Sequence, residues 1–144
     1  MAVDRYLGTF LLMVFACCGG SGSDEMEELV VSMELGQEVY EKYCLACHQK
    51  DGSGVPGLYP PLAQTEWVSG DKDRLIEVIL LGLSGAIDID GEIYDQEMAS
   101  NEFLSDEEIS AVLTYVRSGF GNDSDEITAG EVASVRARLK PNDQ

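Results

Sequence analysis

Residues 44–48 have the order Cys-Leu-Ala-Cys-His, and His48 is the only histidine of the chain. The pattern C-x-x-C-H is the sequence form of a site for covalent haem attachment. Two thiols one helical turn apart can add to the two vinyl groups of one porphyrin, and the adjacent imidazole can then ligate the iron. We therefore predict that Cys44 and Cys47 hold one haem c covalently, with His48 as the proximal iron ligand.

Two other interpretations of this pattern fit the chain less well. A redox-active dithiol needs no following histidine and usually lies between a strand and a helix. A structural zinc site needs four ligands, whereas the sequence offers only Cys17 and Cys18 as further cysteines and no second histidine. Elimination therefore favours haem attachment.

A second iron ligand is expected downstream of the motif. Three methionines follow the N-terminal apolar segment: Met26 in an acidic stretch, Met33 at the start of a predicted helix, and Met98 in a polar segment. Met98 has little apolar core to fill there and is the predicted ligand. A Met/His pair raises the haem potential and closes the iron to small molecules, which favours electron transfer. If Met98 does not bind iron, a five-coordinate haem that binds or senses a small ligand remains the alternative.

Helical periodicity and caps predict the elements that position these residues. Apolar spacing predicts a helix from near Ser32 to Cys44, so the motif lies at its end. Residues 51–62 contain three glycines and three prolines and are predicted to form an irregular loop. Further helices are predicted at 71–81, 105–119 and 128–139, the last two from capping-box patterns, with a short hairpin at 87–94 around Asp90-Gly91. The chain is therefore predicted to be all-α with one small β-ribbon.

The charge of the chain excludes some partners. With 144 residues and a formal net charge of −18, it is one acidic domain that lacks the positive surface needed to bind nucleic acid. No Lys or Arg lies between Arg74 and Arg117, and five acids precede Met98: Asp88, Asp90, Glu92, Asp95 and Glu97. This pattern predicts a redox partner with a basic docking patch. The alternative is an acidic surface kept for solubility or for a salty habitat.

The N-terminus has the form of an export signal. Residues 7–16 are apolar but too few to span a bilayer, and residues 14–17 resemble the lipobox of bacterial lipoproteins. That resemblance implies cleavage before Cys17 and a lipid anchor on its sulfur; an ordinary secretory signal is the alternative. We thus predict a signal peptide (1–16), a flexible acidic linker (17–31) and a haem domain (32–140). Haem c is attached outside the cytoplasm in bacteria, so we expect the periplasm or the outer face of the membrane.

Residues 33–140 resemble a class I c-type cytochrome, and most closely the small cytochrome c domains associated with periplasmic dehydrogenases and redox enzymes. Gly36, Tyr40 and Tyr115 match the residues at which the first and last helices of that family cross. The resemblance implies a cytochrome c fold with three to five helices around one haem. It also implies a carrier of single electrons between redox proteins, not an enzyme, with a fixed subunit of one oxidoreductase complex as the alternative.

The same resemblance assigns two further residues to the haem site. Pro60 matches the family proline whose carbonyl accepts the N–H of the proximal histidine, here His48. Trp67 lies in a segment that resembles the family's propionate region, so its ring N–H is a candidate donor there, with Arg74 as a second candidate. Packing in the core is the alternative role of Trp67.

Overall fold

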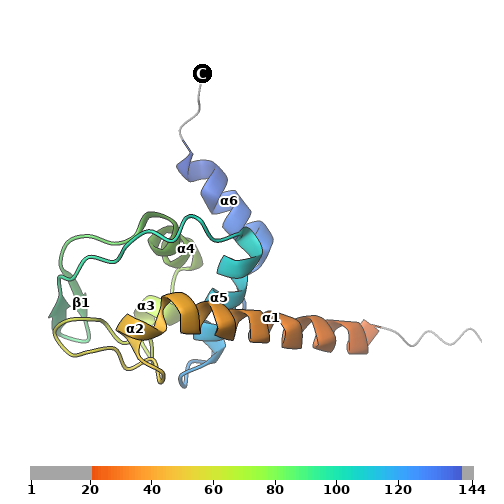
Figure 1. Cartoon of the computed structure of the whole chain (residues 1–144), viewed down its shortest axis with the longest axis horizontal. Coiled ribbons are helices and arrows are strands. Elements are labelled where there is room, and N and C mark those ends of the chain that lie inside the picture. Colours follow the sequence, from red (N-terminus) through yellow and green to blue (C-terminus); the bar gives the residue numbers. More distant parts are fainter. Residues whose placement is uncertain (1–20, 141–144) are drawn as a thin grey trace, which may run out of the picture.

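The computed structural model describes residues 21–140, so the predicted signal segment 1–16 and Cys17 lie outside the described residues. The elements in chain order are α1 (Ser21–Tyr43), α2 (Leu45–His48), α3 (Glu66–Ser69), α4 (Lys72–Leu81), β1 (Ile87–Ile89), β2 (Glu92–Tyr94), α5 (Asp106–Ser118) and α6 (Ala129–Leu139) (Figure 1). The all-α prediction with one short hairpin is confirmed. The described residues contain six helices rather than three to five, because α2 and α3 are single turns of four residues each.

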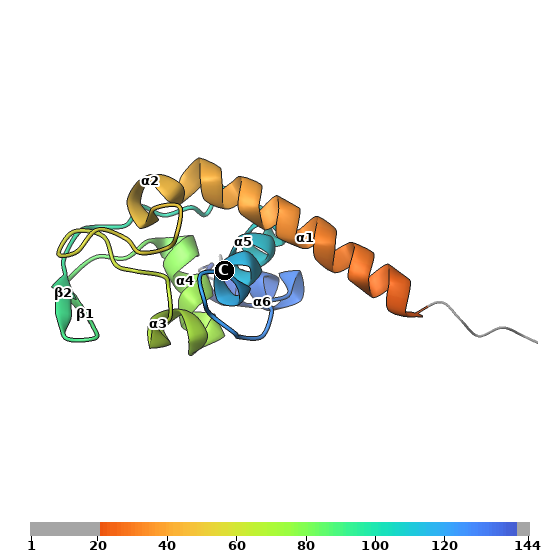
Figure 2. The same ribbon diagram turned by 90° about the horizontal axis from the view of Figure 1, so that it is seen from below.

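Helix α1 crosses α5 near the centre of the molecule (Figure 2). Gly36 lies at this crossing. A Cβ atom at position 36 would lie 2.8 Å from the Cβ of Tyr115 and would also overlap the backbone carbonyl of Ala111. Any larger residue would therefore push the two helices apart, and the helix crossing that the family resemblance implies at Gly36 is present.

Three aromatic rings pack beside the crossing. The ring centroid of Tyr40 lies 5.6 Å from that of Tyr115 and 5.1 Å from that of Phe120, and the latter two are 5.6 Å apart. We call these three residues the aromatic cluster. Tyr40 is only 1% exposed, so the cluster joins the end of α1 to α5 and to the chain that follows α5. The predicted contact between Tyr40 and Tyr115 is confirmed, whereas Phe120 was not predicted.

The start of α1 differs from the sequence-based expectation. A flexible linker was predicted to extend to residue 31 and the helix to begin near Ser32, but the helix begins at Ser21. The linker prediction is therefore wrong for residues 21–31. Met, Glu and Leu have high helix propensity, and acidic side chains near a helix N-terminus interact favourably with the helix dipole. This first part of α1 extends past the other helices, and Met26 is 69% exposed (Figures 1 and 2).

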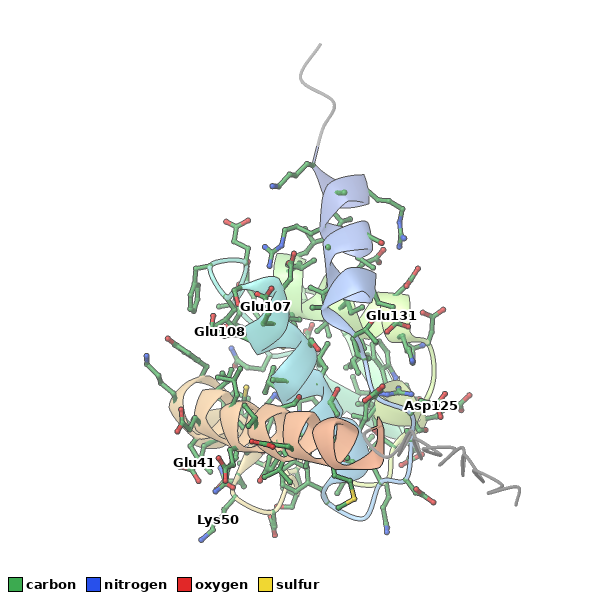
Figure 3. All side chains as sticks on the ribbon, turned by 90° about the vertical axis from the view of Figure 1, so that its right-hand side faces the viewer. Glu41, Lys50, Glu107, Glu108, Asp125 and Glu131 are labelled. Atoms are coloured by element: carbon green, nitrogen blue, oxygen red, sulfur yellow. The ribbon has the colours of Figure 1, made fainter. Side chains whose placement is uncertain are left out.

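The helices α5 and α6 both begin with the predicted capping boxes. The Ser105 hydroxyl accepts from the Glu108 N–H, and the Glu108 carboxylate accepts from the Ser105 N–H. Thr128 and Glu131 exchange the same pair of hydrogen bonds at the start of α6. Figure 3 labels Glu108 and Glu131 at these two helix starts. The predicted boundaries at residues 105 and 128 are therefore confirmed.

Helix α6 packs against α4 and α5. Its buried face includes Val132 and Val135, both fully buried. Ion pairs surround this contact; they are Lys72–Glu131 at 3.2 Å, Arg136–Asp106 at 2.7 Å and Arg138–Asp73 at 2.7 Å. The arginines of α6 thus pair with acidic residues of neighbouring helices. The acidic side chains on the rest of the described protein surface are left largely without a basic partner.

The hairpin has the predicted turn. Strands β1 and β2 are antiparallel, with Ile89 opposite Glu92. Asp90 and Gly91 form the turn with φ values of 54° and 86°, the combination of positive φ values that a two-residue hairpin turn requires. The Asp88 carboxylate accepts from the Gly91 N–H at 2.8 Å and closes the turn. The hairpin lies at the end of the molecule away from the start of α1 (Figure 1).

Candidate functional site

An apolar cavity of about 90 Å³ lies among the helices and the loops that join them. It continues toward the surface as a larger and more polar pocket of about 280 Å³, here called the outer pocket, and six residues line both spaces: Cys44, His48, Pro60, Leu83, Ile87 and Met98. The walls of the inner cavity are almost entirely apolar. Helices α4 and α5 contribute much of the wall; their residues there include Leu75, Ile79, Val112, Leu113 and Val116.

The end of α1 and the single turn α2 present the Cys-x-x-Cys-His motif to this space. Cys44 joins the two helices, and its carbonyl accepts from the His48 N–H at 2.9 Å. Cys47 and His48 lie on α2, and both cysteines are free thiols. Burial, with a smaller effect of Cys47, raises the pKa of the Cys44 thiol to about 11. The structure thus brings the three predicted residues to the rim of one pocket.

The ring of His48 is fixed by a backbone carbonyl. Its Nδ1 lies 3.0 Å from the carbonyl oxygen of Pro60. A carbonyl can only accept a hydrogen bond, so Nδ1 carries the proton and Nε2 keeps a free lone pair. Burial lowers the pKa of His48, and the hydrogen bond to Pro60 offsets part of that effect. The imidazole is therefore neutral and suited to binding a metal. The hydrogen bond that the family resemblance implied is present.

Met98 lies on the chain that leaves the hairpin and lines the same two spaces as His48. Its backbone exchanges two hydrogen bonds with Leu83, each of 2.9 Å. Close by, the Ser100 hydroxyl donates to the Leu80 carbonyl at 2.7 Å. These bonds tie the Met98 segment to the end of α4. Met33, by contrast, lies on α1, where its sulfur accepts from the Ser118 hydroxyl at 3.6 Å.

Sequence reasoning did not identify Leu83 and Ser100 as residues that position Met98. Both act through backbone groups or through a side chain bonded to backbone, over separations of 15 and 20 residues. The one local hint is Gly82, where a Cβ would overlap the Met98 carbonyl and lie 2.9 Å from the Ser100 nitrogen. A glycine at the end of a predicted helix has a simpler explanation as a C-terminal cap.

Trp67 lines the inner cavity, but its ring N–H has another partner than the predicted one. Its Nε1 donates to the Asp88 carbonyl at 3.3 Å. Donation from this nitrogen to a propionate would require that bond to break, and it stays a prediction. The Arg74 guanidinium lies over the Trp67 ring, 4.5 Å from its centroid. The buried Nε of Arg74 has no hydrogen-bond partner among the described residues, which leaves a donor for an anionic group.

The model of the cytochrome c family matches residues 33–120. This range includes the motif, the cavity and Met98. The chain belongs to the cytochrome c family. Members of this family carry covalently bound haem c, and the donor set found here fits that cofactor: two thiols, a neutral imidazole and a thioether around one apolar cavity.

Two groups of cytochromes are similar to this chain. Cytochrome c-552 of Thermus thermophilus is 36% identical over 137 residues, which cover 88% of this chain and 86% of the relative. The fructose dehydrogenase cytochrome subunit of Gluconobacter japonicus is 36% identical over 107 residues, which cover 71% of this chain but 22% of that subunit. A quinone-dependent alcohol dehydrogenase cytochrome c subunit of Gluconobacter oxydans is 29% identical over 116 residues. Cytochromes c of this kind are exported and transfer electrons.

Proposed function

We propose that this cytochrome is a monohaem carrier of single electrons, with Cys44 and Cys47 as the thioether residues and His48 and Met98 as the axial ligands. When bound, the haem supplies an iron that accepts and releases one electron. The observation that carries this proposal is that His48 and Met98 line the same apolar cavity. A carrier needs both axial positions filled, because an open position would admit small molecules and favour binding over electron transfer.

The residues around the ligands fit this role. The hydrogen bond from His48 Nδ1 to Pro60 orients the imidazole and makes it a stronger donor toward the metal. The backbone bonds between Met98 and Leu83 hold the Met98 segment beside the cavity. The apolar walls exclude water, which lowers the reorganisation needed when charge changes. We infer that the chain is not itself an enzyme.

An absorption spectrum with a potentiometric titration tests the proposal. We expect the α and β bands of a c-type haem, a far-red band of a Met–iron bond in the oxidised protein, and one reversible one-electron step. Mass spectrometry should give the mass of the chain plus that of one haem. A spectrum of a five-coordinate haem, or a ferric protein that binds cyanide without first losing a ligand, would contradict ligation by Met98.

A fixed subunit of one oxidoreductase complex is the second candidate function. It is favoured by the similarity to cytochrome subunits of Gluconobacter dehydrogenases. Purification under mild conditions separates the two: a free carrier is isolated alone, whereas a subunit is isolated with a stable partner at fixed stoichiometry.

The proposed docking surface is the hairpin and the segment that leads to Met98. Its acidic side chains are exposed; they are Asp88, Asp90, Glu92, Asp95 and Glu97. Among the described residues none of them forms an ion pair. Glu97 also lines the outer pocket, so this charge lies beside the entrance to the site. A redox partner with a basic patch would be attracted to this surface.

A lipid anchor on Cys17 would hold the domain at the membrane. No described helix is both long and apolar enough to cross a bilayer. Only three residues separate Cys17 from Ser21, where α1 begins, so a fully extended chain would place the anchor within about 14 Å of the helix. The replacement Cys17→Ser tests this idea: loss of membrane association with retained haem would support the anchor, and unchanged association would exclude it.

A further inference from the structure

Tyr40 forms hydrogen bonds on both sides of the haem-binding motif. Its backbone carbonyl accepts from the Cys44 N–H at 2.9 Å, and its hydroxyl donates to the Gln49 carbonyl at 2.7 Å. These two partners are the first residue of the motif and the residue directly after it. The ring is buried in the aromatic cluster, with 1% of its surface exposed. Core packing therefore fixes the position of the hydroxyl.

The backbone of Gln49 has a conformation that glycine normally takes. Its φ is 63° and its ψ is 166°, a combination that is strained for a residue with a Cβ atom. Such a conformation persists only where the surroundings hold it. Two donors reach its carbonyl: the Tyr40 hydroxyl at 2.7 Å, and the Gly52 N–H at a longer 3.3 Å. The shorter bond comes from a buried and rigid side chain.

The conformation of Gln49 sets the path of the chain beyond His48. The His48 carbonyl accepts from the Gly54 N–H at 3.0 Å. The loop then continues to Pro60, whose carbonyl lies 3.0 Å from Nδ1 of the same histidine. The imidazole and its acceptor are thus two ends of one loop, and Gln49 is the first residue of that loop.

We propose that Tyr40 is a positioning residue for His48: its hydroxyl holds Gln49 in the glycine-like conformation and so keeps the Pro60 carbonyl opposite Nδ1. The proposal rests on the proposed ligation by His48. Loss of the Tyr40 hydroxyl lets Gln49 relax and weakens the bond to Pro60. An imidazole with a weaker acceptor at Nδ1 is a weaker donor and stabilises ferric iron less. The reduction potential then rises.

Three variants of the haem-loaded protein test this role. Tyr40→Phe removes only the hydroxyl and keeps the ring, so we expect a higher potential and a shifted Nδ1 proton signal of His48 in the NMR spectrum of the reduced protein. Adding Gln49→Gly should return both values to those of the wild type, because glycine takes this backbone conformation without strain. Tyr115→Phe removes a hydroxyl from the same aromatic cluster and should change neither value.

The outcomes separate positioning from packing. A Tyr40→Phe protein with the wild-type potential and NMR signal would overturn the proposal, and so would a double variant that is not restored. If Tyr40→Phe alone does not accumulate with haem, the double variant carries the test: it should accumulate with wild-type values, and its failure to do so would overturn the proposal. Ligation by His48 and Met98 is tested separately by the spectrum of the wild type, so failure of the proposed function is recognised before any variant is made.

Discussion

At the scale of single residues, iron ligation depends on which side-chain atoms have a lone pair available for the metal. The Pro60 carbonyl occupies the Nδ1 proton of His48 and leaves Nε2 as the only metal-binding nitrogen. Met98 offers a sulfur with no proton to lose, so its binding is independent of pH over the range in which proteins are stable. We therefore expect the replacement of either ligand to change the spectrum and the reduction potential of the haem.

Met98→Ala should open the sixth coordination position. We expect loss of the far-red band and new binding of cyanide or imidazole. The reduction potential should fall by about 0.1 V, a small part of the range that axial ligands span. Spectroscopy and potentiometry measure all three effects. Met33→Leu is the matched control, because Met33 lies on α1 and bonds to Ser118. An unchanged far-red band in Met98→Ala would assign the ligand elsewhere.

At the scale of elements, helix contacts rather than helix propensities decide the geometry. Gly36 has a lower helix propensity than alanine, yet it allows α1 and α5 to approach closely. The contact at Gly36 joins two helices that are distant in the sequence, whereas each capping box of α5 and α6 is formed by residues only three apart. The first feature is sensitive to packing and the second to charge and hydrogen bonding.

Gly36→Ala should destabilise the protein. The new Cβ meets the Ala111 carbonyl and the Tyr115 side chain at distances that real Cβ atoms do not adopt, so we expect a loss of about 1–3 kcal/mol in the free energy of unfolding. Thermal or denaturant unfolding of the haem-loaded protein measures it. Gly130→Ala in α6 is the control: its Cβ would meet only the Thr128 hydroxyl at 3.9 Å, and it should be neutral or stabilising. Equal effects of the two substitutions would contradict the crossing argument.

Glu131→Gln should remove part of the acid sensitivity of the protein. Hydrogen bonds from Thr128, and the contact with Lys72, lower the pKa of Glu131 below its usual range. A carboxyl group with a lowered pKa stabilises the fold above its unfolded pKa, and this contribution disappears as the pH falls through the folded pKa. The variant should therefore be slightly less stable than the wild type at neutral pH, by a fraction of about 1 kcal/mol because the exposed pair is screened by solvent, and equal to the wild type in strong acid. Asp123→Asn, an exposed change in the preceding loop, should give no such convergence.

At the scale of the whole molecule, the helices enclose an apolar cavity beside a buried hydrophobic core. The buried residues of α4 and α5 face the same space as the haem-binding motif. A domain of this size buries only a modest fraction of its surface, so the cofactor must supply much of the apolar contact. The fold and the cofactor therefore depend on each other.

A chain that cannot bind haem should remain largely unfolded. Replacing both Cys44 and Cys47 with serine removes covalent attachment and leaves the apolar cavity without its contents. Circular dichroism should then show little helix and no cooperative melt, whereas the haem-loaded protein should show both. A native-like cooperative melt of the exported serine variant would refute the dependence on haem.

The acidic hairpin should control the rate of encounter with a basic redox partner. At low salt, Asp95→Asn with Glu97→Gln should slow electron transfer by roughly 2- to 5-fold, and added salt should reduce the difference. Stopped-flow kinetics against a cationic acceptor protein measures both effects. Glu27→Gln with Glu34→Gln is the charge-matched control on α1, whose free end lies far from the hairpin (Figure 1). Equal rates for the two double variants would favour the solubility or salt-adaptation alternative.

The sequence alone determined the features that depend on near neighbours in the chain. The motif at residues 44–48, both capping boxes and the Asp90-Gly91 turn were predicted, because their groups lie within a few residues of one another. The family resemblance added the bond between His48 and Pro60. The start of α1 was missed, since a glycine- and serine-rich segment with several acids favours disorder by composition but contains enough strong helix formers to continue the helix.

Only the tertiary structure decided how distant segments meet. It gave the Trp67 ring N–H a backbone partner in the hairpin, left the Arg74 Nε without one among the described residues, and tied Met98 to Leu83. It also joined the Tyr40 hydroxyl to Gln49. Each of these contacts closes a loop through backbone carbonyl or amide groups. Every residue except proline carries both groups, so residue types give no sign of which pairs will meet.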